Sequence, residues 1–109
     1  MKQYYDPINN RLVYIENKAS ALFWDMHWEK YDVTKTVQSA ALNRRILLPT
    51  RRYLPTGSRI LEGGCGLGQN VWSLYKHGYD VYGVDYADET VKKVNSCMPE
   101  LNVSHGDLR

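Results

Sequence analysis

A cluster of glycines in the second half of the chain carries the clearest chemical signal. It comprises Gly64, Gly66 and Gly68, and the acid Glu62 stands two residues before it. Glycine permits a backbone with positive φ and lets a ligand approach the main chain closely. If a helix follows, its first N–H groups and its dipole favour an anion, such as a pyrophosphate or an amino-acid carboxylate. The cluster therefore indicates a binding site for one of these two groups.

The spacing of the glycines discriminates between these two ligands. A dinucleotide-binding loop has glycines at positions i, i+2 and i+5. Position i+5 from Gly64 is Gln69, and from Gly66 it is Val71, so neither start matches. The glycines stand instead at i, i+2 and i+4. This spacing disfavours a nicotinamide-dependent dehydrogenase, which stays open as an alternative that binding of NAD would reveal.

Short strands and helices alternate around this cluster. The patterns of apolar and turn-forming residues predict strands at 59–62, 80–85 and 101–104, and helices at 69–76 and 88–97. Such an alternation is typical of a parallel sheet with crossover helices. We therefore expect an α/β fold with a Rossmann-like parallel sheet over residues 57–109.

The residues that follow the predicted strands resemble those of a known family. Glu62 with the glycine loop resembles motif I of the class I S-adenosylmethionine-dependent methyltransferases. Asp85 ends the second predicted strand, where that family places an acid. The segment Gly106-Asp107-Leu108 follows the third predicted strand and resembles the family segment that meets adenine. The resemblance covers residues 57–109, the N-terminal, cofactor-binding part of such a domain.

The resemblance implies a site for S-adenosylmethionine. Glu62 and the loop backbone hold the methionyl end, and Asp85 accepts hydrogen bonds from both ribose hydroxyls. Tyr86 flanks the adenine ring, and Asp107 binds its amino group. Cys65 is expected to contribute its backbone rather than a reactive thiol. The implied cofactor-binding residues are Glu62, Gly64, Cys65, Gly66, Gly68, Asp85, Tyr86, Asp107 and Leu108.

Residues 1–56 differ in character, and we predict that they form a helical cap or lid before the sheet. One helix is expected from about Asn17. Its predicted apolar face consists of Ala19, Leu22, Phe23 and Met26. A second helix is expected from Thr36, as N-cap, to Leu48, because Pro49 disfavours a helical residue before it.

Aromatic residues within the first of these helices are candidates for the acceptor side of the site. Trp24, Trp28 and Tyr31 recur at helical spacing and can line a pocket, although packing alone also explains such a stripe. The candidate catalytic residues are His27, as a general base near neutral pH, and Tyr31. A single histidine without a visible partner is more often structural, so the sequence does not assign the catalytic residues.

A run of basic residues bears on the kind of methyl acceptor. Six Lys or Arg residues and no acid lie between Val33 and Leu61. Such a run can meet an anionic substrate, RNA or a membrane surface. The net charge of the chain is only +2, however, and no nucleic-acid motif is present. We therefore expect a small-molecule acceptor, with an RNA methyltransferase as an alternative that a steep salt dependence would reveal.

The composition is that of an ordinary globular domain. The 109 residues are 43% hydrophobic and 24% charged, and this length allows one domain. No apolar run approaches the ~18 residues of a membrane span, and the first residues lack the core of a signal peptide. The two cysteines, 32 positions apart, make neither a disulfide framework nor a metal site. These features predict a cytoplasmic protein without a metal.

The sequence stops at Arg109, before the further strands of the family fold. In that fold the next strand pairs with the free side of the first, so residues 59–62 are expected to keep an open edge. We expect the rest of a longer enzyme, a second copy or another partner to cover this edge. The 109 residues alone are expected to bind cofactor without turnover, and a non-catalytic binding module is a further alternative.

Overall fold

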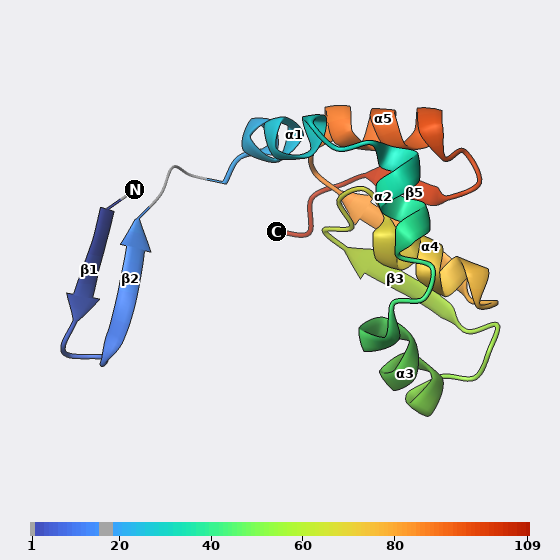
Figure 1. Cartoon of the computed structure of the whole chain (residues 1–109), viewed down its shortest axis with the longest axis horizontal. Coiled ribbons are helices and arrows are strands. Elements are labelled where there is room, and N and C mark those ends of the chain that lie inside the picture. Colours follow the sequence, from blue (N-terminus) through green and yellow to red (C-terminus); the bar gives the residue numbers. More distant parts are fainter. Residues whose placement is uncertain (1, 16–18) are drawn as a thin grey trace.

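The fold is described by a computed structural model, which covers residues 2–15 and 19–109 (Figure 1). In this part of the chain the elements are β1 (Lys2–Asp6), β2 (Arg11–Ile15), α1 (Ala21–Glu29), α2 (Val33–Ser39), α3 (Arg44–Tyr53), β3 (Arg59–Gly63), α4 (Gln69–Lys76), β4 (Asp80–Asp85), α5 (Asp88–Cys97) and β5 (Asn102–His105). None of the helices in these residues has the length and hydropathy that crossing a bilayer requires.

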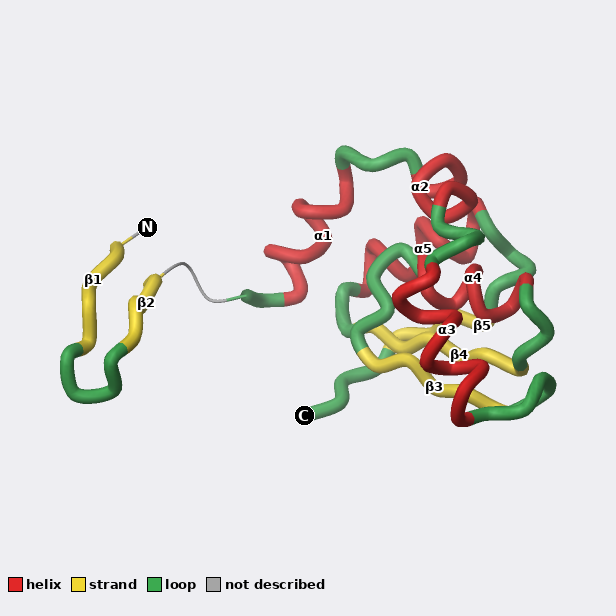
Figure 2. The backbone as a smooth tube through the Cα atoms, turned by 60° about the horizontal axis from the view of Figure 1, so that its bottom comes forward, coloured by secondary structure: helices red, strands yellow, loops and turns green. Residues whose placement is uncertain are grey.

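Strands and helices alternate from β3 to β5 as the sequence predicts. The bounds of α4, β4 and α5 are those predicted, β3 is one residue longer than predicted, and β5 is shifted by one residue at both ends. The three strands are parallel, in the order β3-β4-β5. Figure 2 shows α4 and α5 on the same side of this sheet. The fold is therefore α/β with a Rossmann-like parallel sheet.

The helices and the covered face of the sheet share one apolar core. Its buried residues include Val33 and Val37 of α2, Leu47 of α3, Val71 and Leu74 of α4, Val91 and Val94 of α5, and Val81 and Val103 of the strands. Because α2 and α3 contribute to the same core as α4, the helices before the sheet pack directly onto the α/β unit. This packing places α2 beside the glycine loop, where Thr36 and Ser39 line a hollow together with Gly64.

β3 lies at the edge of the sheet. It pairs with β4 on one side, and in the described ranges no strand pairs with its other side. The face opposite α4 and α5 carries Leu61 and Tyr82, which are 63% and 40% exposed. Parallel sheets are normally covered on both faces. The open edge expected from the sequence is present, together with an open face.

The predicted bounds of the second helix, from Thr36 to Leu48, are wrong. This segment contributes to two helices, α2 and α3, with residues 40–43 between them. Asp32 rather than Thr36 caps α2, because its Oδ1 accepts a hydrogen bond from the backbone N–H of Lys35 (2.9 Å). The cap lies one turn earlier than the hydroxyl that the sequence suggested.

Pro49 lies inside α3 instead of ending a helix. Proline lacks the N–H that would donate a hydrogen bond to the carbonyl of Arg45. Because both residues are exposed, water can bind that carbonyl instead. Thr50 supports the same turn, because its Oγ1 donates to the carbonyl of Ile46 (2.7 Å). Exposure therefore makes the proline tolerable at a position where local preference predicts a stop.

The first residues of the expected helical cap form an antiparallel hairpin of β1 and β2. Asp6 stabilises the turn, because its Oδ1 accepts a hydrogen bond from the N–H of Ile8 (3.1 Å), and Asn10 has a φ of +49°. The predicted start of the first helix at Asn17 lies outside the described residues. The observed helix, α1, follows Ser20, whose hydroxyl oxygen accepts from the N–H of Phe23 (3.2 Å).

The predicted apolar face of α1 does not pack into the core. Leu22 and Met26 are 67% and 64% exposed, whereas Trp28 packs against the core. The inward face carries Asp25 and Trp28, because Asp25 binds α5 and Trp28 contacts the glycine loop. Periodicity identified the helix but not which of its two adjacent faces has partners.

Candidate cofactor-binding site

The glycine loop forms the predicted turn from β3 into α4. Gly64, Gly66 and Gly68 all have positive φ, at +69°, +56° and +86°. The loop is attached to the end of β4, because the N–H groups of Gly64 and Cys65 both donate to the carbonyl of Val84 (2.7 and 3.1 Å). A Cβ at Gly64 would meet no atom within 4 Å. A ligand can therefore approach the main chain at this residue.

Glu62 lies near the end of β3 with one carboxylate oxygen unsatisfied. Its Oε1 accepts a hydrogen bond from Nδ2 of Asn70 (2.9 Å), whereas Oε2 is buried and has no partner among the described residues. Burial raises the pKa of this carboxyl, and the bond from Asn70 opposes that shift. A buried acceptor without a partner is unfavourable. Its position suits a donor supplied by a ligand, such as an ammonium group.

Asp85 lies at the end of β4 and holds the loop in place. It is 7% exposed. Its Oδ2 accepts from the N–H of Gly66 (2.8 Å), and its Oδ1 accepts from the N–H of Ala87 (2.9 Å). Each carboxylate oxygen can accept a second hydrogen bond. Asp85 therefore has a structural role that the sequence does not predict, and it keeps capacity for two ribose hydroxyls.

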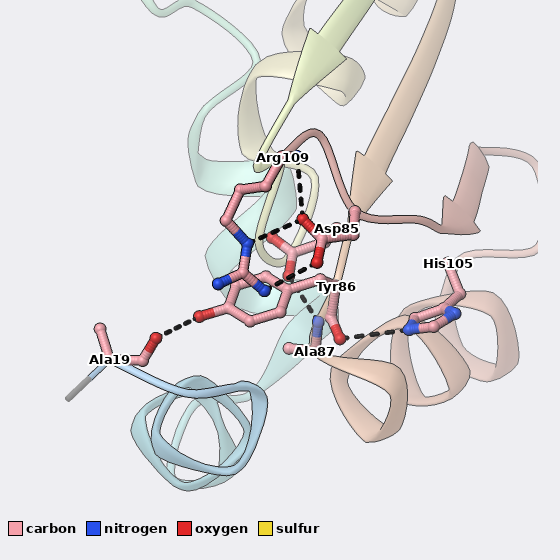
Figure 3. Close-up of polar contacts among 7 residues, drawn as sticks. Ala19, Asp85, Tyr86, Ala87, His105 and Arg109 are labelled. Carbon is pink, nitrogen blue, oxygen red and sulfur yellow. Dashed lines mark hydrogen bonds and ion pairs between the residues drawn. The ribbon is translucent and has the colours of Figure 1, made fainter.

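Tyr86 lies beside Asp85, with its ring among polar contacts from three segments (Figure 3). Its hydroxyl donates to the carbonyl of Ala19, and a ring nitrogen of His105 lies 3.2 Å from its carbonyl oxygen. The guanidinium of Arg109 lies 5.1 Å from the centroid of its ring. The same guanidinium binds Asp107 (2.7 Å), and these hydrogen bonds lower the pKa of Asp107 to about 2. Asp107 is thus already paired with Arg109. A ligand amino group would either share Asp107 with Arg109 or take the place of Arg109.

Three adjoining hollows follow the glycine loop. Their volumes are about 320, 320 and 520 Å³, and Gly64 lines all three. Every predicted cofactor residue except Gly68 lines at least one of them. The structure therefore brings these residues together in one groove along the loop. Asp107 and Leu108 line the first hollow, and Glu62 lines the third.

Other residues of the groove were missed, or assigned mainly to packing, by sequence reasoning. Trp28 lies directly on Gly66, since a Cβ at that glycine would come within 2.9 Å of the indole ring. Gly63 is covered by the side chain of Leu108 in the same way. Asn70 binds Glu62 from the first turn of α4. Its position directly after the loop was the one signal that could have identified it.

Cys65 is buried beneath the loop. Burial, with the negative charges of Asp85 and Glu62, raises the pKa of its thiol to about 12. A Cβ at Gly83 would lie only 2.8 Å from Sγ, so the thiol fills the space over β4. These observations describe a packed side chain whose backbone belongs to the loop.

Neither candidate catalytic residue lines the three hollows. His27 lies among the aromatic rings of α1, with centroid distances of 5.5 Å to Trp24 and 4.7 Å to Trp28. Tyr31 packs against the core, and its carbonyl accepts a hydrogen bond from Nζ of Lys93 (2.9 Å). A catalytic role for either residue stays a prediction.

Two comparisons place the chain in a family. The family model described as tellurite resistance protein TehB matches residues 22–106. The crystal structure of a TehB-like SAM-dependent methyltransferase from Corynebacterium glutamicum is also similar. It has a TM-score of 0.55 and 30% sequence identity, over 76% of this chain and 46% of that chain.

Two curated relatives are fungal enzymes. The S-adenosyl-L-methionine-dependent Diels-Alderase iccD of Talaromyces variabilis is 46% identical over 50 residues, which are 46% of this chain and 17% of that protein. The S-adenosyl-L-methionine-dependent Diels-Alderase iliD of Neonectria sp. (strain DH2) is 34% identical over 55 residues, 50% of this chain and 22% of that protein. The chain spans less than half the length of each of these relatives. It belongs to the TehB family, with the fold and the glycine loop of the class I methyltransferases, whose cofactor is S-adenosylmethionine.

Proposed function

We propose that this chain is the cofactor-binding part of an S-adenosylmethionine-dependent methyltransferase that acts on a small molecule. The observation that carries the proposal is the buried, unpartnered Oε2 of Glu62 at one end of the groove, with the carboxylate of Asp85 further along. The amino-acid end of the cofactor supplies an ammonium group, and its ribose supplies two hydroxyls. Carboxylates at these two places match both donors.

The remaining contacts follow from this orientation. The carboxylate of the cofactor faces the start of α4, where the helix dipole favours a negative charge. Tyr86 flanks the adenine ring. Asp107 accepts from the adenine amino group in place of Arg109, and Leu108 covers the ring. Backbone atoms of the loop, rather than side chains, make the closest approach at Gly64.

We further propose that residues 1–56 cover the cofactor bound by residues 57–109. The contacts that support this are those of Trp24 and Trp28, which line the middle hollow together with Gly64. The bound cofactor supplies an electrophilic methyl group. The chain holds the cofactor, and the indole rings exclude water from the side where an acceptor aligns with the methyl group.

The basic residues do not favour an RNA acceptor. Arg44, Arg45, Arg51 and Arg52 are exposed on α3, and none of them lines the three hollows along the loop. The indole rings of Trp24 and Trp28 suit an apolar organic molecule instead. A small-molecule acceptor is therefore the better match.

The two curated relatives favour a second candidate function, a cycloaddition that depends on S-adenosylmethionine. A Diels–Alder reaction joins a diene and a dienophile without releasing any group, so the methyl group would remain on the cofactor. Product analysis distinguishes the two functions in the full enzyme. Methyl transfer forms one S-adenosylhomocysteine per product, whereas cycloaddition leaves S-adenosylmethionine intact.

Calorimetric titration of the chain with S-adenosylhomocysteine tests the binding site, with NAD as a parallel ligand. We expect saturable binding of the first ligand only. Asp85→Asn keeps the shape of the side chain but removes its charge and one of its two acceptors for backbone N–H groups, and we expect it to weaken binding about tenfold. Asp88→Asn, at an exposed position on α5, is the matched control. Binding of NAD, or no binding of S-adenosylhomocysteine by a folded chain, would overturn the proposal.

A further inference from the structure

Glu62 belongs to a chain of hydrogen bonds that continues beyond the loop. Its Oε1 accepts from Nδ2 of Asn70 (2.9 Å), and Oδ1 of Asn70 accepts from Nδ2 of Asn43 (3.1 Å). The three residues come from β3, from α4 and from the turn between α2 and α3. All three are half-buried and line the third hollow.

The carboxylate sets the direction of this hydrogen-bonded chain. An ionised carboxylate only accepts hydrogen bonds, so Asn70 turns its NH₂ group toward Glu62 and its carbonyl oxygen toward Asn43. Asn43 must then present its own NH₂ group. Both amides thus donate in the direction of Glu62, which fixes Oε1 and leaves Oε2 as the free acceptor.

Asn43 takes part in this chain instead of capping its own helix. It occupies the N-cap position of α3, where an asparagine side chain normally accepts from a backbone N–H of the first turn. Its side chain makes no such bond and instead reaches Asn70, 27 residues further along the chain. The side chain therefore serves the surroundings of Glu62 rather than α3.

We infer that Asn70, held in turn by Asn43, is a positioning residue that orients Glu62 so that its free oxygen receives the ammonium group of the cofactor. The inference rests on the proposed function. It assigns the turn between α2 and α3 to recognition of the amino-acid end of the cofactor, and not of its nucleoside end. The two asparagines act through Glu62 and touch no reacting atom.

A pair of ligands tests this assignment on the full chain. S-adenosylhomocysteine carries the amino-acid end, whereas 5′-methylthioadenosine has the same nucleoside and sulfur without it. We expect Asn70→Ala to weaken the binding of S-adenosylhomocysteine about three- to tenfold, the usual effect of one lost hydrogen bond. The affinity for 5′-methylthioadenosine should not change. Calorimetry gives both dissociation constants.

Asn43→Ser separates positioning from stability. Serine is a good N-cap, so the substitution does not weaken the start of α3, but its shorter side chain does not reach Asn70. We expect affinity for S-adenosylhomocysteine to fall as in Asn70→Ala, with a thermal midpoint no lower than that of the wild type. Asn95→Ala, at an exposed position on α5, is the matched control and should change the affinity for neither ligand.

A double-mutant cycle tests whether the asparagines act through the carboxylate. In a Glu62→Gln background, Asn70→Ala should cause no further loss of affinity for S-adenosylhomocysteine. Additive losses would overturn the inference, and so would an equal weakening of both ligands by Asn70→Ala. A wild-type chain that binds both ligands equally well would also overturn it. A folded chain that binds neither ligand would overturn the proposed function itself.

Discussion

Glu62 combines a proposed binding role with an unfavourable effect on the unliganded fold. Burial raises the pKa of its carboxyl above the ordinary value of 4.5, so the folded state binds the proton more tightly than the unfolded state does. The protonated carboxyl therefore contributes to the free energy of unfolding. This contribution is fully present below pH 4.5 and is lost as the pH rises through the raised pKa. At neutral pH the buried charge therefore destabilises the fold until a cation pairs with it.

We predict that Glu62→Gln raises the thermal midpoint of the unliganded chain at neutral pH and that this gain disappears as the pH falls toward 4.5. The neutral amide has no charge to bury, and its oxygen still accepts from Asn70. Circular dichroism melts across this pH range measure the difference from the wild type. Glu100→Gln, at an exposed position, should show no gain. A gain that persists unchanged in acid would contradict the role of the buried charge.

The two thiols are expected to differ in reactivity. Cys97 is exposed, whereas Cys65 is buried with a pKa raised to about 12. Because the thiolate is the reactive form, an aromatic disulfide reagent should modify one thiol rapidly in the folded chain and the second only after unfolding. Cys97→Ser should remove the rapid phase. Two rapid phases in the wild type would show that the loop opens far more than this structure indicates.

Residue types and spacing located the glycine loop and the acids around it. A sharp strand-to-helix turn requires glycine, so Gly64 and Gly66 were visible in the sequence. The bond between Asp85 and the N–H of Gly66 was not visible, and neither was the link from Asn43 to Asn70. These contacts join residues far apart along the chain, and only packing brings them together.

At the scale of elements, α1 is held on α5 by hydrogen bonds at its middle and at its C-terminal end. Oδ1 of Asp25 accepts from the N–H and the hydroxyl of Thr90 (2.9 and 2.8 Å), in the first turn of α5. Nζ of Lys93 donates to the carbonyls of Glu29 and Tyr31 (3.0 and 2.9 Å), at the end of α1. Each helix thus satisfies backbone groups that the other leaves open.

We predict that Asp25→Ala destabilises the chain by about 1–2 kcal/mol, because it removes the side-chain acceptor of the Thr90 N–H in the first turn of α5. Chemical denaturation measures this loss. Hydrogen exchange should also show faster exchange of the α1 amides. Lys92→Ala, whose ion pairs are exposed, should leave both measurements unchanged. Unchanged hydrogen exchange of the α1 amides in Asp25→Ala would show that Asp25 does not hold α1 on α5.

The elements after residue 57 were predictable because their signals are local. Gly68 and Gly78 both have positive φ. They mark the start and the end of α4, where the sequence predicts them. Before that point tertiary contacts decide the structure. Pro49 is tolerated inside α3, the hairpin occupies a predicted helical segment, and the inward face of α1 is set by its contacts with α5 and with the loop.

At the scale of the whole molecule, the described residues leave an open sheet edge at β3 and an open sheet face that carries Leu61 and Tyr82. Unpaired backbone groups beside exposed apolar side chains favour association with another strand. In a longer protein we propose that a further strand and its helices cover this side. A small-molecule acceptor, a covering partner and a cytoplasmic location stay predictions at this scale.

We predict that the 109-residue chain self-associates as its concentration rises. Leu61→Lys should shift the mass toward the monomer, because a charge on the exposed face opposes stacking of two sheets. Light scattering after size-exclusion chromatography measures the mass. Tyr53→Lys, at an exposed aromatic position on α3, should not change it. A wild-type chain that stays monomeric at high micromolar concentration would contradict this prediction.

The contact between Trp28 and Gly66 has an optical consequence. The chain has three tryptophans: Trp24 and Trp28 line the middle hollow, and Trp72 is buried in α4. The emission of an indole ring depends on the polarity around it, so a ligand in the groove alters the fluorescence of the first two and leaves that of Trp72 as an internal reference. The molecule thus carries its own spectroscopic reporter, which follows occupancy of the groove without any attached dye.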